Sequence, residues 1–267
     1  FYLAQSHGNR IDQSLEKVKQ LGNHFSISII NLTDLDRIQK DKEYFLSYKR
    51  NEIDNLVKNF ARLDDTFGAY FYFNPNLLGE AHDIWYRKSE TGTYERQPEA
   101  PEEYYSRNYP WDNIYGKYSN VNMDWYYKPI DKGRAVWSDL YGDWVDDSVR
   151  TLSYTKAVYK DNTLLGVAGM DINFNKIRKA IEKIEVYDNG YAFLLNKDYN
   201  FLVHPEYSKD EKLDNLVNEK VLKYLSENKN GILNYSLEGQ KLVVAHTELL
   251  NGWILSVAVT REEIFAE

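Results

Sequence analysis

The chain has 267 residues, of which 43% are hydrophobic and 15% aromatic, so it can bury a substantial core and is not a disordered segment. Its formal net charge of −8, from 41 acidic and 33 basic residues, argues against a nucleic-acid or anionic-membrane surface. Cysteine is absent, which excludes disulfides and thiolate metal sites, and no apolar run approaches the roughly 18 residues that span a bilayer.

The first 62 residues carry the periodicity of helices. Apolar residues recur every three or four positions from Ile11 to Ile29, with Gly22 taking one place in this seam. The pattern leaves two possibilities open, because such a seam can pack on its own domain or against a partner helix in a dimer. Two further helical segments follow before the period changes.

The remainder of the chain alternates strand and helix signals. Strands are expected at 68–75, 83–89, 150–160, 163–174, 190–205, 231–249 and 252–264, and helices at 175–184 and 213–228. Asp161-Asn162, Lys197 to Asn200 and Glu238-Gly239 are the expected hairpin turns. We therefore expect an α+β fold, with a long N-terminal helix and two α/β sandwich units that contain antiparallel sheets. The expected division is a helical stalk at 1–62, a first unit at 63–174, and a linker helix with a second unit at 175–267.

The sequence motifs of common enzymes are missing. There is no Walker-type phosphate loop, no G-x-G-x-x-G, no G-x-S-x-G and no H-E-x-x-H, and the 5 histidines are scattered without ligand-like spacing. We expect a binding domain with no catalytic residues, no metal and no cofactor. An acid/base hydrolase remains an alternative, because 41 acidic residues provide many carboxylate pairs.

One segment, "NMDWYYKPIDKGRAVWSDLYGD" at 122–143, is dense in both rings and carboxylates. With its neighbours it supplies the rings of Tyr118, Trp125, Tyr126, Tyr127, Trp137 and Tyr141 and the carboxylates of Asp124, Asp143 and Asp171. Aromatic walls with carboxylates suit a small cation, held by cation–π contact and charge-assisted hydrogen bonds. The chemistry alone leaves a second interpretation open, in which the rings pack in a core and the acids cap the surface.

The blocks "WYYKPIDKGRAVWSDLYGD" and "GVAGMDI", in this order, resemble the double Cache (dCache, tandem PAS-like) extracytoplasmic sensor domain of bacterial transmembrane receptors. The resemblance extends over nearly the whole chain, including the unit that opens with "GYAFLLNKDYNFLVHP". It implies a membrane-distal, ligand-binding first unit, a membrane-proximal second unit and a homodimer through the N-terminal helix. It also implies flanking membrane-spanning segments and a histidine kinase, diguanylate cyclase or chemotaxis output domain.

In family members that bind amino acids, the matching positions contact the ligand. The resemblance assigns this role to Tyr118, Trp125, Tyr126, Tyr141, Asp143 and Asp171, and we add Trp137 as a further wall. Asp171 is then the residue that holds the ligand's ammonium group. His82 and Trp85 are weaker candidates for the same site.

One family residue differs. The arginine that clamps the ligand carboxylate stands two places before the tryptophan, and this chain has Met123 there. Methionine offers only apolar contact, so a buried carboxylate would lose its bidentate partner. We therefore expect an amine or quaternary ammonium ligand. An amino acid held by another cation, such as Lys128 or Arg134, is an alternative, as are a purine, an organic acid, and a secreted solute-binding role.

Overall fold

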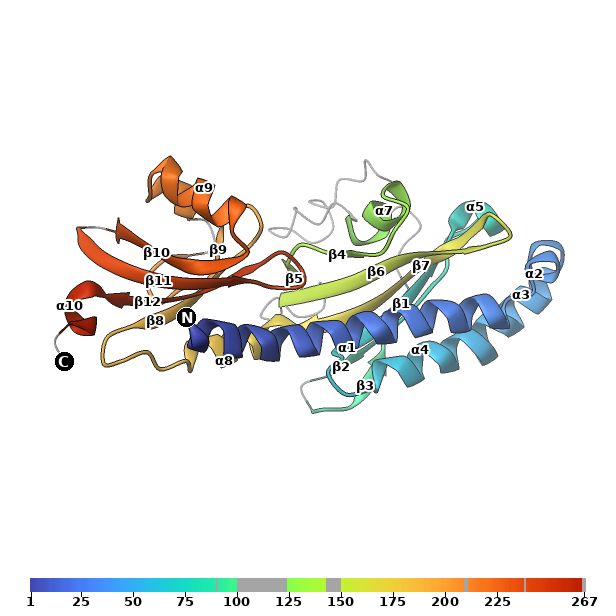
Figure 1. Ribbon diagram of the computed structural model, residues 1–267. Helices are drawn as coiled ribbons and strands as arrows, with labels where there is room; N and C mark the ends of the chain where they lie inside the picture. Colours follow the sequence, from blue (N-terminus) through green and yellow to red (C-terminus); the bar gives the residue numbers. More distant parts are fainter. Residues whose placement is uncertain (90, 100–123, 143–149, 209–210, 238, 266–267) are drawn as a thin grey trace. The chain divides into compact units, whose positions relative to one another are not determined.

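The computed structural model describes residues 1–89, 91–99, 124–142, 150–208, 211–237 and 239–265 (Figure 1). Tyr118, Met123 and Asp143 lie outside these residues. Two compact units are present: Lys17–Phe174, here called the N-terminal sheet unit, and Phe1–Glu16 with Asn175–Glu267, here called the C-terminal sheet unit. The first helix therefore contributes residues to both units.

The predicted helical character of the N-terminal region is confirmed. It contains α1 (Tyr2–Leu32), α2 (Leu35–Lys40), α3 (Lys42–Tyr48), the π-helical turn η1 (Lys49–Ile53) and α4 (Asp54–Ala61). Asp34 and Asp41 divide the helices, because each has extended backbone and accepts a hydrogen bond from a main-chain N–H of the following helix.

The apolar seam of α1 is covered by the chain itself. Ile11 is partly exposed, and the large residues that follow it are 0% exposed: Leu15, Val18, Phe25 and Ile29. Gly22 is required in this seam, because a Cβ there would lie 2.6 Å from a ring carbon of Tyr154. Of the two possibilities that the sequence left open, packing on its own chain is therefore the one observed.

A seven-stranded antiparallel sheet forms the N-terminal sheet unit, in the order β3-β2-β1-β7-β6-β4, with β5 also paired to β6. The strands are β1 (Gly68–Phe73), β2 (Asp83–Lys88), β3 (Tyr94–Arg96), β4 (Val136–Trp137), β5 (Tyr141–Gly142), β6 (Arg150–Lys160) and β7 (Thr163–Asn173). The short helix α5 (Pro75–Leu78) follows β1, and α7 (Asp124–Asp131) precedes β4. The predicted turn between β6 and β7 is confirmed, since Asp161 and Asn162 have φ of 49° and 62°.

The two faces of this sheet are covered by different helices. Figure 1 shows α1 and α4 on one face and α7 on the other. Phe73 points to the first face, where its ring centroid lies 5.2 Å from that of Phe45 in α3. Because side chains alternate along a strand, Tyr72 points to the opposite face, towards α7.

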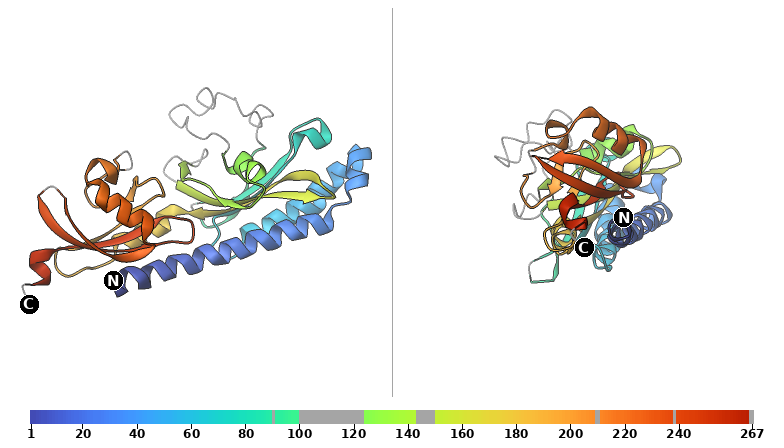
Figure 2. Two further views of the ribbon diagram at one scale, coloured as in Figure 1. Left: turned by 45° about the horizontal axis from the view of Figure 1, so that its top comes forward. Right: turned by 60° about the vertical axis from the view of Figure 1, so that its left-hand side comes forward.

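The C-terminal sheet unit has a five-stranded antiparallel sheet in the order β10-β11-β12-β8-β9. Its elements are α8 (Phe174–Glu182), β8 (Tyr191–Leu195), β9 (Phe201–Val203), the 3-10 turn η4 (Leu213–Asn215), α9 (Glu219–Glu227), β10 (Asn230–Leu237), β11 (Gln240–Glu248), β12 (Ile254–Thr260) and α10 (Arg261–Ile264). Helix α9 packs over this sheet (Figure 2), with Val221 and Leu225 in the core. The expected hairpins β8–β9 and β10–β11 are confirmed.

A charged network connects the residues next to β2 with the helices on the α1 and α4 face of the sheet. Lys49 is 8% exposed, and its Nζ lies 2.6 Å from a Glu99 oxygen and 3.1 Å from His82 Nδ1. The centroid of the His82 ring lies 5.0 Å from that of the Phe45 ring, so His82 lies on the face of the sheet that α1 and α4 cover. His82 therefore does not join Trp85 on the α7 side, as the sequence had suggested it could.

Glu99 gives this network a pH dependence. His82, Lys49 and Arg96 lower the pKa of Glu99 to about 2 from the usual 4.5. A carboxyl whose pKa is depressed by folding stabilises the protein above its unfolded pKa, and this contribution is lost as the pH falls towards the folded value. The free energy of unfolding should therefore fall less between pH 4.5 and pH 2 in Glu99→Gln than in the unchanged protein, as measured by urea titrations at each pH. Glu95→Gln, on the same hairpin, serves as control, and equal slopes in Glu99→Gln and the unchanged protein would contradict the expectation.

Candidate ligand-binding site

Strand register places Asp171 at the centre of the α7 face of the sheet. Asp171 on β7 pairs with Gly68 on β1 and with Ser153 on β6. Paired residues point to the same face, as do residues two apart on one strand. Gly169 and Tyr70, which also pair, therefore lie beside Asp171 on that face.

The Asp171 carboxylate is buried and accepts hydrogen bonds from neutral donors. It is 1% exposed. Ser153 Oγ lies 2.5 Å from Oδ1, Tyr141 Oη donates to the same oxygen at 3.4 Å, and Trp85 Nε1 donates to Oδ2 at 3.1 Å. Donors of this kind stabilise the ionised form of a carboxyl. An ionised carboxylate beside aromatic rings is a suitable acceptor for the cationic nitrogen of a small ligand.

Aromatic rings form the rest of this face. The Trp125 ring of α7 lies 4.6 Å from the Tyr72 ring and 5.2 Å from the Tyr70 ring, both in edge-to-face geometry. Trp85 and Tyr126 complete a cluster with Val167, and all three are buried. We call Tyr70, Tyr72, Trp85, Trp125 and Tyr126 the aromatic cluster. Such rings present negative faces that attract cations.

Tyr70 packs directly on Gly169. A Cβ at Gly169 would lie 2.0 Å from Cζ of Tyr70, so only glycine permits this approach. The Tyr70 hydroxyl is buried near the Ser153 hydroxyl, and it makes no hydrogen bond of good geometry within the described part of the chain. Burial and the nearby Asp171 carboxylate raise the pKa of Tyr70 well above its usual value, so the hydroxyl keeps its proton.

Four of the sequence-predicted site residues come together here: Trp125, Tyr126, Tyr141 and Asp171. Trp85 also belongs to the cluster. Trp137 does not, because it pairs with Tyr154, the neighbour of Ser153, and so points to the opposite face. Its ring lies 5.2 Å from the Tyr154 ring.

Sequence reasoning missed three contributors: Tyr70, Tyr72 and Ser153. The alternation in "GAYFYF" puts Tyr70 and Tyr72 on one face, but it does not say which face meets α7. Lys128, considered as a substitute carboxylate clamp, lies between Asp124 and Asp139 at 2.6 and 2.8 Å, and Arg134 is exposed. Among the residues with described positions, no group of three or more His, Asp and Glu side chains is arranged to hold a metal.

Tyr141→Phe tests the rim of this site. The substitution removes a hydroxyl that lies 2.5 Å from Ser153 Oγ and 3.4 Å from Asp171. Since one neutral hydrogen bond contributes about 1 kcal/mol, ligand affinity should fall about two- to tenfold, as measured by calorimetry. Tyr159→Phe, at a side chain that is 42% exposed, is the control. An unchanged affinity would show that this hydroxyl does not act on the site.

Comparison with known proteins decides the family. The sequence model of the Cache domain, in its dCache_1 form, matches residues 2–267. The chain belongs to the Cache domain family. Cache domains of chemoreceptors and histidine kinases are extracytoplasmic sensor domains that bind ligands and catalyse no reaction. The predicted double Cache architecture is thereby confirmed.

The curated relatives of this Cache domain are chemoreceptors. Methyl-accepting chemotaxis protein McpA of Bacillus subtilis is 27% identical over 254 residues, which is 94% of this chain and 33% of that protein. PctB of Pseudomonas aeruginosa is 23% identical over 80% of this chain and 32% of its own length. The chain thus spans about a third of the length of the curated relatives that it matches.

Solved structures share the fold. The extracellular domain of mmHK1S-Z2, a protein assigned as a histidine kinase, aligns with a TM-score of 0.72 and 17% identity over 98% of this chain and 96% of that one. The ligand-binding domain of Campylobacter jejuni chemoreceptor Tlp3, solved with L-norvaline, aligns with a TM-score of 0.66 and 15% identity over 99% and 90% of the two chains. Within the described residues of this Cache domain, no helix has the length and apolarity to cross a membrane.

Proposed function

We propose that this Cache domain binds a small ligand with a cationic nitrogen at Asp171 and the aromatic cluster. The observation that carries the proposal is a buried carboxylate, held in place by hydrogen bonds from Trp85, Tyr141 and Ser153, beside five aromatic rings. A primary ammonium would gain a charge-assisted hydrogen bond, and a quaternary ammonium would gain cation–π contacts with Trp125 and Tyr72. An amine or quaternary ammonium compound is therefore the ligand class that we place first.

The relatives support a sensor role. Tlp3 is a chemoreceptor whose domain has been solved with L-norvaline, L-valine and isoleucine, so the same fold holds a small ammonium-bearing molecule there. We propose that the whole protein is a bacterial receptor, tethered to the membrane by segments outside this chain and signalling to a cytoplasmic output domain. Tyr118, Met123 and Asp143 remain proposed site residues, assigned by their positions in the sequence.

A thermal-shift screen with amines, quaternary ammonium compounds and amino acids tests the proposal, with calorimetry on each hit. A ligand at a hundredfold excess over its dissociation constant adds about 2.7 kcal/mol to the unfolding free energy. Spread over a domain of this size, that raises Tm by several degrees. If no compound with a cationic nitrogen binds, or if the best one binds Asp171→Asn equally well, the proposed site is wrong.

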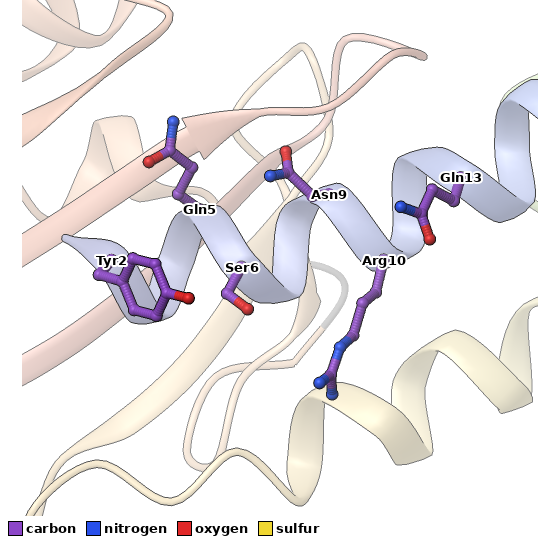
Figure 3. A pocket seen from close by; sticks show the side chains of 6 residues that line it. All are labelled: Tyr2, Gln5, Ser6, Asn9, Arg10 and Gln13. Atoms are coloured by element: carbon purple, nitrogen blue, oxygen red, sulfur yellow. The ribbon is translucent and has the colours of Figure 1, made fainter.

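The proposed homodimer has to use a different face of α1 from the buried seam. A surface hollow of about 310 Å³ lies along the first turns of this helix (Figure 3), and its lining is mostly uncharged: Tyr2, Gln5, Ser6, Asn9, Arg10 and Gln13. Amide side chains both donate and accept hydrogen bonds, so two copies of such a stripe can pair with each other. Sedimentation velocity should show a dimer that Asn9→Glu weakens, and a monomer at high concentration would contradict this proposal.

A further inference from the structure

The side chain of His204 holds together a tight turn that follows β9. Nδ1 of its ring accepts hydrogen bonds from the main-chain N–H groups of Glu206 and Tyr207, at 3.0 and 3.1 Å. Pro205 comes first after the histidine and has no N–H, so the ring nitrogen serves the next two donors. We call residues 204–207 the His204 turn. Because Nδ1 is an acceptor here, the neutral ring carries its proton on Nε2.

The His204 ring is packed among four other rings of the C-terminal sheet unit. The centroid distances are 4.6 Å to Tyr207, 4.9 Å to Phe201, 5.0 Å to Tyr191 and 5.4 Å to Phe193. Phe193 and Phe201 belong to the buried core of this unit, and Tyr191 and Tyr207 pack against that core. The His204 turn is therefore attached directly to the core of its unit.

The surroundings of the ring favour its neutral form. Among the described residues, Glu211 is the charged group that acts on the ring. The side chain of Glu206 is exposed, and the phenols of Tyr191 and Tyr207 carry no charge in acid. Burial lowers the pKa of His204 to about 4, and the Glu211 carboxylate, which raises this pKa, opposes the effect only in part.

A proton on Nδ1 is incompatible with the His204 turn. It would point at the N–H groups of Glu206 and Tyr207, so both hydrogen bonds would be lost and three hydrogens would converge on one place. The protonated ring can avoid this conflict by leaving the turn for water, where an imidazolium is well solvated. Protonation and opening of the turn are therefore linked.

We infer that the His204 turn is an acid-sensitive switch in the C-terminal sheet unit, which is closed while the His204 ring is neutral and opens when Nδ1 gains a proton. The Tyr207 ring is stacked on the Phe201 ring at 4.9 Å and 24°, so opening also uncovers the edge of the core. This inference is independent of the proposed function, because Asp171 lies in the N-terminal sheet unit.

Proton linkage gives the direction and size of the effect. With a pKa of about 4 in the closed turn and the ordinary 6.5 in the open turn, His204 stabilises the closed turn fully above pH 6.5. This contribution is lost as the pH falls from 6.5 towards 4, and the equilibrium constant for opening should rise about fiftyfold between pH 7 and pH 4.5. Exchange of the Glu206 and Tyr207 amides, followed by NMR and corrected for the intrinsic rate at each pH, measures this as lost protection.

His204→Asn separates the hydrogen-bond acceptor from the titrating proton. Asn196 shows that an asparagine can hold such a turn in the same unit, because its Oδ1 accepts from the N–H groups of Asp198 and Asn200 at 3.0 and 2.9 Å. Asparagine does not titrate, so the amides of the His204 turn should keep their protection at pH 4.5 in this variant. His24→Gln, at an exposed position of α1, is the control and should lose protection as the unchanged protein does.

Two results in the exchange experiment would overturn the inference. One is equal protection of these amides at pH 7 and pH 4.5 in the unchanged protein, and the other is a loss in His204→Asn as large as in the unchanged protein. The ring itself provides a measurement that needs no variant. Its nitrogen chemical shifts should show the proton on Nε2 at pH 7 and a titration midpoint well below 6.5, and a midpoint at 6.5 or above would equally overturn the inference.

Discussion

Asp171→Asn is expected to weaken ligand binding strongly while leaving the fold intact. Removing one partner of a buried charge pair costs about 2–5 kcal/mol, so the affinity for a cationic ligand should fall at least about thirtyfold. The fold should survive because an amide fits the existing partners. Its oxygen can accept from Trp85 Nε1, and its NH₂ can donate to the hydroxyls of Ser153 and Tyr141, which are able to accept.

Asp171→Ala is the comparison that separates charge from packing. Alanine leaves the buried Trp85 N–H and Ser153 hydroxyl without their acceptor, which should cost about 1–3 kcal/mol of unfolding free energy. Both variants should therefore lose ligand affinity in calorimetry, whereas only Asp171→Ala should lose stability in urea denaturation. An Asn variant that binds the ligand like the unchanged protein would refute the role given to Asp171.

Gly169→Ala is expected to destabilise the protein and weaken ligand binding together. The new Cβ would lie 2.0 Å from Cζ and 2.4 Å from the hydroxyl oxygen of Tyr70. Since Gly169 is in the middle of β7, the backbone cannot move away, and the Tyr70 ring has to shift. Overpacking of this kind costs about 1–3 kcal/mol. The displaced ring would enter the space that we assign to the ligand.

The double variant Gly169→Ala with Tyr70→Ala tests this explanation. If the cost of the methyl group comes from its clash with Tyr70, the cost should largely vanish once the ring is gone, and the two changes should be strongly non-additive. Urea denaturation of the four proteins in this cycle gives the coupling energy. Additive effects would show that Gly169→Ala acts through the backbone and not through Tyr70.

The fold was largely predictable from local patterns. The helical seam of α1, the turn at Asp161-Asn162 and the hairpins of the C-terminal sheet unit all follow from signals within a few residues of one another. One helix prediction was wrong in detail, because the expected helix at 213–228 is a 3-10 turn followed by α9.

The candidate site was predictable only in part. Resemblance to the family supplied Trp125, Tyr126, Tyr141 and Asp171, and the structure brings these four together. Trp137 had the same composition-based support as Trp125, yet it lies on the other face because its partner is Tyr154. The bulk of a tryptophan says nothing about the face on which it is buried.

The sequence by itself determined which segments are helices, strands and turns, and it identified one carboxylate on which the binding hypothesis depends. The tertiary structure decided which side chains share a face with that carboxylate. Tyr70 on β1 and Ser153 on β6 are distant in sequence from each other, and the pairing of both strands with β7 places them beside Asp171. A shift of one residue in any of these registers would move the side chain to the opposite face, and pairing between distant strands leaves no periodic trace in the sequence.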